Sequence, residues 1–121
     1  MPVQKRALRA FKTAFFKALA HPLRIQILDA LRDRPHGVGE LATLLNVETP
    51  NLSQQLAVLR AANIVSTRKE GNFVYYSVQD PALFDLLDAA RVIFNNHLIG
   101  MHEMLKELQL DAGDSLSGND S

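Results

Sequence analysis

The sequence predicts a mainly helical fold with one small β-hairpin, and three observations lead to this prediction. Apolar residues recur every three to four positions along five segments, as they do in amphipathic helices. Residues 64–68 and 73–78 are rich in β-branched and aromatic side chains and flank residues 69–72 (KEGN), which is a hairpin pattern. A chain of 121 residues, 47% of them hydrophobic, suffices for one core. We expect one domain over residues 1–110 and a disordered acidic tail over residues 111–121.

The first three helices are separated by residues that break helices. A helix is expected over residues 5–19, followed by His21 and Pro22. Proline disfavours the helical conformation in the residue before it and suits the first turn of a new helix, so a second helix should begin at Pro22. The turn-forming run RDRPHG, residues 32–37, ends that helix. A third helix is expected over residues 38–45.

A fourth helix follows the third after a short turn and is expected over about residues 50–62. Asn46 tolerates the left-handed backbone conformation that ends a helix, and Val47 is an apolar residue within the turn. Thr49 and Pro50 resemble an N-cap followed by proline at the first helical position. Two short helices joined by a tight turn are the packing pattern of a helix-turn-helix.

The fourth helix carries side chains that suit the recognition of DNA. In a helix-turn-helix the second helix presents its N-terminal side chains to the major groove. Amides form paired hydrogen bonds with adenine, and hydroxyl groups bind base edges or phosphates. The candidates for DNA contact on this helix are Thr49, Asn51, Ser53, Gln54, Gln55 and Arg60. The alternative is that they form only the solvated surface of a helix.

The predicted hairpin supplies a second group of candidate DNA contacts. Arg68, Lys69 and Asn72 cluster at its expected tip. Cations on a projecting hairpin bind the phosphate backbone with an affinity that depends on salt and little on sequence. Residues 68–73 are therefore interpreted as a wing, and the alternative is a hairpin that only closes the core.

Three stretches of the chain together resemble the ArsR/SmtB family of bacterial winged-helix repressors. They are LAHPLRIQIL at 19–28, LSQQLAVLRAANIV at 52–65 and KEGNFVYYS at 69–77, and the resemblance spans nearly all of residues 14–94. It implies a homodimer, built from the first and last helices, that binds a palindromic operator and releases it when an inducer binds. Many members carry a histidine where this chain has Gln55, which affects the details of base readout and keeps hydrogen-bonding capacity.

The last predicted helix independently favours a dimer. Asp80 and Pro81 open a pattern of apolar residues that continues to about residue 108 and would form a helix about 40 Å long. Leaving its apolar stripe in water costs about 25 cal/mol per Å². Twofold pairing would also place two recognition helices about 34 Å apart, one turn of DNA. The alternative is that the helix folds onto its own domain. The residues expected at the dimer interface are Phe11, Phe15, Ile93, Phe94, His97, Leu98, Met101 and Leu105.

Most residues of a metal-sensing site are missing. The family resemblance would place a Glu-Leu-Cys-x-Cys box at residues 40–44, which read ELATL, and the chain has no cysteine. Soft-metal binding at that box and dithiol sensing are therefore excluded. His97 and His102 lie five residues apart, about 140° around a helix, and cannot chelate one ion from one helix. Across a dimer either could still meet carboxylates and hold zinc or nickel. That site is an alternative to the prediction of no cofactor, and the inducer, if the protein has one, is unidentified.

The zero net charge of the chain conceals two parts of opposite charge. Lys and Arg outnumber Asp and Glu by 11 to 5 before Gln79, whereas from Gln79 onward the acidic residues outnumber the basic ones by 8 to 2. A basic part favours a polyanionic partner. No phosphate-binding glycine loop, nucleophile elbow or HExxH pattern is present, so we expect no enzyme. No apolar run of about 18 residues or signal peptide appears, so we expect a cytoplasmic protein without a membrane partner.

The sequence thus predicts a homodimeric, sequence-specific DNA-binding transcriptional repressor whose partner is double-stranded operator DNA. The alternative from another class is a winged-helix protein-interaction module, in which the long helix and the acidic tail bind a protein.

Overall fold

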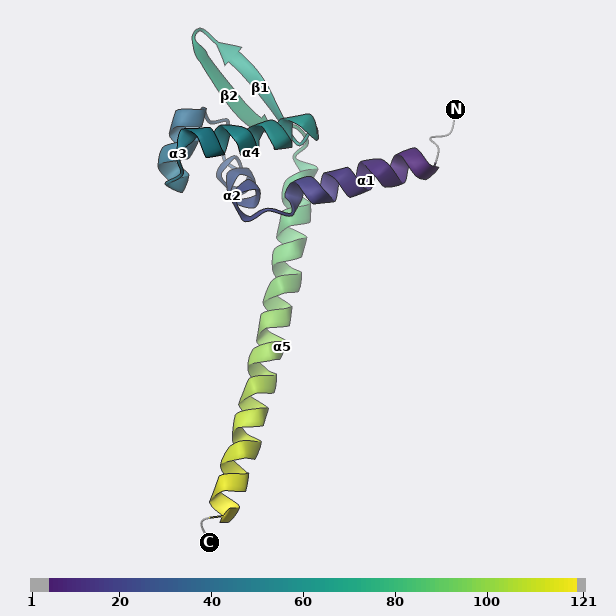
Figure 1. Cartoon of the computed structure of the whole chain (residues 1–121), viewed down its shortest axis with the longest axis vertical. Coiled ribbons are helices and arrows are strands. Elements are labelled where there is room, and N and C mark those ends of the chain that lie inside the picture. Colours follow the sequence, from purple (N-terminus) through teal and green to yellow (C-terminus); the bar gives the residue numbers. More distant parts are fainter. Residues whose placement is uncertain (1–4, 120–121) are drawn as a thin grey trace. The chain divides into compact units, whose positions relative to one another are not determined.

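The computed structural model describes the backbone of residues 5–119 and the side chains of residues 5–112. The chain divides into two compact units, Met1–Phe84 and Asp85–Ser121. The structure confirms the predicted order of four helices, a two-stranded antiparallel hairpin and a last helix (Figure 1). The elements are α1 (Lys5–Leu19), α2 (Pro22–Ala30), α3 (Val38–Leu45), α4 (Thr49–Ala61), β1 (Val65–Glu70), β2 (Phe73–Val78) and α5 (Ala82–Asn119).

The core of the first unit lies between α2, α3 and α4, and the hairpin projects from this group of helices in Figure 1. Each of the three helices buries leucine or isoleucine side chains on its inner side, whereas Ile25 of α2 and Leu44 of α3 are exposed. The fully buried aliphatic side chains of these helices are Ile27, Leu28, Leu41, Leu52, Leu56 and Leu59. Because truncation of such residues to alanine costs about 2–5 kcal/mol, this small cluster accounts for much of the stability of the unit.

The predicted break between the first two helices is present, and His21 has a defined task in it. Its backbone is extended, with φ −153° and ψ 127°, and its Nδ1 accepts a hydrogen bond from the Leu23 N–H at 3.1 Å. His21 is therefore the N-cap of α2, and Pro22 occupies the first turn, where no backbone N–H is needed.

The turn of the helix-turn-helix depends on Asn46, whose backbone is left-handed with φ 53° and ψ 51°. The Val47 N–H then donates to the Ala42 carbonyl at 3.1 Å, which satisfies a carbonyl at the end of α3. The predicted N-cap is shifted by one residue, because Glu48 and not Thr49 precedes the first helical residue. Proline fits either position, since the first N–H groups of a helix have no partner within it.

The end of α4 sets the direction of the hairpin. Asn63 is left-handed with φ 58°, the Ile64 N–H donates to the Leu59 carbonyl at 3.0 Å, and the Asn63 N–H donates to the Arg60 carbonyl at 3.0 Å. These two bonds form a Schellman motif, and the buried Ile64 packs where such motifs place an apolar residue. The chain leaves α4 directly into β1.

The hairpin is tighter than the sequence predicts. β1 and β2 pair from Val65 opposite Val78 to Glu70 opposite Phe73, so the loop is Gly71 and Asn72 alone. The expected four-residue loop over 69–72 is thus wrong by two residues. The reason is that Gly71 adopts φ +60°, as two-residue hairpin loops require, and this lets the strands continue pairing to the loop.

α5 begins as predicted but extends further. The Asp80 carboxylate accepts a hydrogen bond from the Ala82 N–H at 2.9 Å and caps the helix. The helix continues to Asn119, past its expected end near residue 108, because no proline follows Pro81 and each glycine weakens a helix by only about 1 kcal/mol. Residues 120–121 of the expected tail lie outside the described residues, and disorder of residues 111–121 in solution stays a prediction.

Within residues 5–119, no helix combines the length and the hydropathy that crossing a membrane requires.

Candidate nucleic-acid interface

The outer surface of α4 is polar because its inner surface carries all of its buried leucines. Gln54 lies two residues from both Leu52 and Leu56, about 200° around the helix from Leu52, and therefore points away from the core. Of the residues predicted to contact DNA on this helix, Gln55 is half-buried and the others are exposed. The exposed ones are Thr49, Asn51, Ser53, Gln54 and Arg60.

Asn51 and Gln55 are joined to each other on this surface. The Gln55 Nε2 donates to the Asn51 Oδ1 at 3.3 Å across one helical turn. This bond orients both amides before any ligand arrives, which lowers the entropy cost of a paired contact with a base. Each amide keeps further hydrogen-bonding atoms that the bond does not use.

A shallow cleft of about 500 Å³ connects α4 with the base of the hairpin. Ser53 and Arg60 of α4 line it together with Tyr76 of β2. The fold therefore brings two of the predicted α4 residues next to the hairpin, as expected for a recognition helix with a wing beside it.

The two predicted wing cations do not form a single patch. Arg68 and Lys69 lie within β1, paired with Tyr75 and Val74, and not in the loop at the tip. Neighbouring residues of a strand point to opposite faces of the hairpin, so these two side chains diverge. Asn72 occupies the loop itself and is exposed. The sequence identified the residues of the wing but not the direction in which each one points.

Sequence reasoning also missed the acidic residue of the wing. Glu70 lies on the same face of β1 as Arg68, and its Oε1 is 2.9 Å from Arg68 Nη2. Lys69 forms no ion pair among the residues that the structure describes. An exposed ion pair such as that of Arg68 contributes only about 0–1 kcal/mol, so a phosphate can compete for the guanidinium.

A buried histidine of the turn-forming run at residues 32–37 pairs with the hairpin. His36 is 2% exposed, and its backbone forms two hydrogen bonds with Tyr76 of β2. The His36 N–H donates to the Tyr76 carbonyl at 3.0 Å, and the Tyr76 N–H donates to the His36 carbonyl at 2.8 Å. Residue 36 therefore forms an isolated β-bridge that connects the α2–α3 loop to the wing.

Carboxylates lie at both nitrogens of the His36 ring. Nε2 is 3.2 Å from Asp33 Oδ1, and Nδ1 is 3.0 Å from Glu40 Oε1. Arg34 also binds Glu40, and this contact is the main reason why the pKa of Glu40 falls to about 2, with His36 as a second cause. The hydrogen bond with His36 lowers the pKa of Asp33, and Glu40 raises the pKa of Arg34. The spacing D33-x-x-H36-x-x-x-E40 is the only sequence signal of this network.

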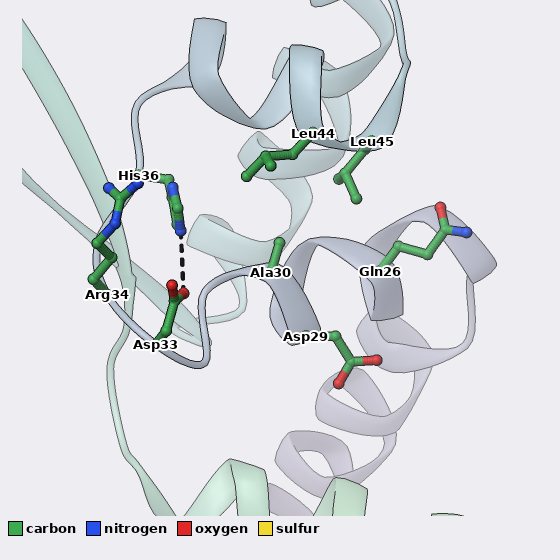
Figure 2. A pocket seen from close by; sticks show the side chains of 8 residues that line it. All are labelled: Gln26, Asp29, Ala30, Asp33, Arg34, His36, Leu44 and Leu45. Carbon is green, nitrogen blue, oxygen red and sulfur yellow. Dashed lines mark hydrogen bonds and ion pairs between the residues drawn. The ribbon is translucent and has the colours of Figure 1, made fainter.

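The same network borders an open cleft of about 700 Å³. Figure 2 shows the His36 ring pointing toward Asp33 on one side of the cleft, with Leu44 and Leu45 of α3 on another. The remaining lining residues are Gln26, Asp29, Ala30 and Arg34.

The residues expected at a dimer interface are mostly exposed in the single chain. In the first unit, Phe11 of α1 is 60% exposed and stacks on the half-buried Phe15 at 6.5 Å between ring centroids. In the second unit, Phe94 of α5 is 65% exposed. The other α5 residues of the expected interface are also exposed, and they are Ile93, His97, Leu98, Met101 and Leu105. Their role in pairing stays a prediction.

No three His, Cys, Asp or Glu side chains are grouped so as to hold a metal ion within the described residues. His97 and His102 belong to no such group among these residues.

Comparison with known proteins identifies the family. Residues 21–67, which include the helix-turn-helix, match the family model "Bacterial regulatory protein, arsR family". The chain is 41% identical over 108 residues to the HTH-type transcriptional regulator Rv0081 of Mycobacterium tuberculosis, covering 88% of this chain and 95% of that protein. It is 38% identical to the biofilm growth-associated repressor of Agrobacterium fabrum, covering 78% and 81% of the two chains.

Solved structures agree with the sequence comparison. The crystal structure of Rv0081 superposes with a TM-score of 0.69 at 46% identity, covering 75% of this chain and 92% of that one. The homodimeric winged helix-turn-helix DNA-binding domain Mb0332 of Mycobacterium bovis gives a TM-score of 0.73 at 30% identity, covering 81% and 91%. The sequence relatives are transcriptional regulators and not enzymes. The chain therefore belongs to the ArsR family of bacterial regulatory proteins, and the resemblance found in its sequence is confirmed.

Proposed function

We propose that this chain is a homodimeric repressor that binds a palindromic operator, with α4 in the major groove and the wing on the phosphate backbone. The observation that carries the proposal is the polar outer surface of α4, which lies opposite a fully buried leucine stripe and beside a cationic hairpin. The repressor relatives and the homodimeric DNA-binding domain of the same fold support it. Because bacterial DNA lies in the cytoplasm, the proposal also places the protein there.

Gln54 is the α4 residue with the clearest role in reading sequence. Its amide is exposed on the side of the helix furthest from the core, so it can form a paired contact with adenine without moving the fold. Asn51 and Gln55 present a second, already oriented pair of amides. Thr49, Ser53 and Arg60 flank these amides and contact base edges or phosphates.

The test is a fluorescence anisotropy titration with duplex DNA from upstream of the gene and with a scrambled duplex, at two salt concentrations. Gln54→Ala should lose about 1–3 kcal/mol on the upstream duplex and almost nothing on the scrambled one. Gln79→Ala, an exposed amide outside α4, is the matched control and should behave as wild type. Absence of binding to either duplex at low salt would reject the proposal.

The proposed dimer pairs the exposed apolar residues of α1 and α5 with those of a second copy. Sizing of the pure protein tests this part separately from DNA binding. A monomer without DNA affinity would favour the protein-interaction module, in which the acidic α5 binds a protein.

A zinc- or nickel-responsive repressor requires that His97 or His102 meet carboxylates of the second copy. Equilibrium dialysis against zinc and against nickel, with DNA affinity measured before and after, separates this possibility from an organic inducer and from the absence of one.

A further inference from the structure

His36 joins three elements of the proposed DNA-binding unit at one point. Its backbone is bonded to Tyr76 of β2, its ring contacts Asp33 in the α2–α3 loop, and its ring contacts Glu40 in the first turn of α3. Because α3 packs against α4 and β2 is half of the wing, residue 36 lies between the wing and the helix that supports α4.

The contacts of the His36 ring depend on whether the ring is protonated. A neutral imidazole carries an N–H on only one of its two nitrogens. Because a carboxylate oxygen lies near each nitrogen of His36, the lone pair of the other nitrogen must face a carboxylate. The imidazolium carries an N–H at both nitrogens and is attracted to both carboxylates. Nδ1 is buried and lies 3.0 Å from the Glu40 oxygen, so the charge of a protonated ring would act on this carboxylate at close range.

The surroundings keep both carboxylates charged at neutral and mildly acidic pH. Arg34 holds the pKa of Glu40 at about 2, and the pKa of Asp33 is also lowered, so both stay anionic across the range where imidazole changes charge. The charged or titratable groups around the ring are Asp33 and Arg34 of the loop, Glu40 of α3, Asp29 of α2, and Tyr75 and Tyr76 of β2.

We propose that His36 is a proton-dependent positioning residue, whose protonated ring holds the base of the wing against the start of α3 and whose neutral ring holds it less firmly. This inference rests on the proposed function only where it concerns DNA. Protonation favours the held arrangement, so DNA affinity is highest at acidic pH and falls as the ring loses its proton.

The DNA experiment measures affinity for the upstream duplex from pH 5.5 to 8.5 at constant ionic strength. The affinity of wild type should fall about fivefold between pH 6 and pH 8. This corresponds to a weak coupling between protonation of His36 and DNA binding, at the low end of the range typical of allosteric sites. His36→Gln should lose most of this fivefold change, and any change that remains belongs to other groups such as His97 and His102. His21→Asn, which removes the other imidazole of the first unit and keeps an N-cap side chain, should retain the wild-type profile. A His36→Gln profile that keeps the wild-type pH dependence would overturn the inference.

Asp33→Asn keeps the test valid if His36→Gln does not fold, because the Asp33 side chain is 71% exposed. Loss of this carboxylate removes one of the two anionic partners of the protonated ring, so the change in affinity between pH 6 and pH 8 should be smaller than in wild type, and an unchanged profile contradicts the inference.

A readout without DNA separates the inference from the proposed function. NMR of the free wild-type protein should show the Tyr76 amide shifting together with the His36 ring as pH changes, and Asp33→Asn should alter both profiles together. If the protein binds no DNA, the proposed function fails and this titration alone decides the inference. A Tyr76 amide that ignores the titration of His36 refutes it.

Discussion

The charge balance of the wing gives a quantitative prediction with two opposite perturbations. Each wing carries the free cation Lys69 and the cation Arg68, which Glu70 partly neutralises at 2.9 Å. In the proposed homodimer each substitution is present twice. One phosphate contact contributes about 0.9 to the slope of log affinity against log salt, so Lys69→Ala should flatten the slope by about 1.8.

The size of this effect follows directly. Between 50 and 200 mM salt, a slope change of about 1.8 means that wild type loses roughly twelvefold more affinity than Lys69→Ala. Glu70→Gln acts in the other direction, because it releases Arg68 for a phosphate and removes a negative charge from the wing, so the slope should steepen by up to about 1.8.

The assay is the anisotropy titration repeated at four or more salt concentrations on the upstream and the scrambled duplex. Both wing substitutions should act equally on the two duplexes, because phosphate contacts carry no sequence information. Lys106→Ala, an exposed lysine in the second unit, is the control. Equal slopes for wild type, Lys69→Ala and Glu70→Gln would refute the assignment of the hairpin as a wing on the phosphate backbone.

Four further predictions concern folding and assembly. Leu56→Ala, at a fully buried position, should lower the free energy of unfolding in urea by about 2–5 kcal/mol, and a loss below 1 kcal/mol would contradict its place in the core. Gly71→Ala should cost about 1–2 kcal/mol in the same measurement, since φ is +60° there, and a neutral effect would argue against the two-residue loop. The pKa of Glu40 is lowered from 4.5 to about 2, so its stabilising contribution is complete above pH 4.5 and is lost as pH falls toward 2. Over that range Glu40→Gln should therefore lose less stability than wild type, as followed by circular dichroism. Parallel curves for the two proteins would exclude the ion pairs of Glu40 as a source of acid sensitivity. Phe94→Glu should shift the protein toward monomer in sedimentation velocity while preserving its helical circular dichroism, and an unchanged dimer would remove Phe94 from the interface.

Local rules predicted most of the fold because the deciding residues lie within a few positions of the features that they control. His21 and Pro22 separate two helices, Asn46 ends α3, and Gly71 permits the hairpin loop. In each case the conformation depends on the backbone preferences of one residue and its neighbours. The polar surface of α4 was likewise predictable, since a buried stripe at helical spacing determines which residues face outward.

The sequence by itself determined the helix-turn-helix, the hairpin and the residue types of the candidate DNA surface, and it carried the pattern of the ArsR family. Only the tertiary structure decided that Arg68 and Lys69 point to opposite faces, because their orientation follows from the strand register and the length of the loop. Only the tertiary structure placed His36 against Tyr76, which lies on a different element and far along the chain. Pairing across that separation depends on how the core packs as a whole, and spacing rules for neighbouring residues hold no information about it.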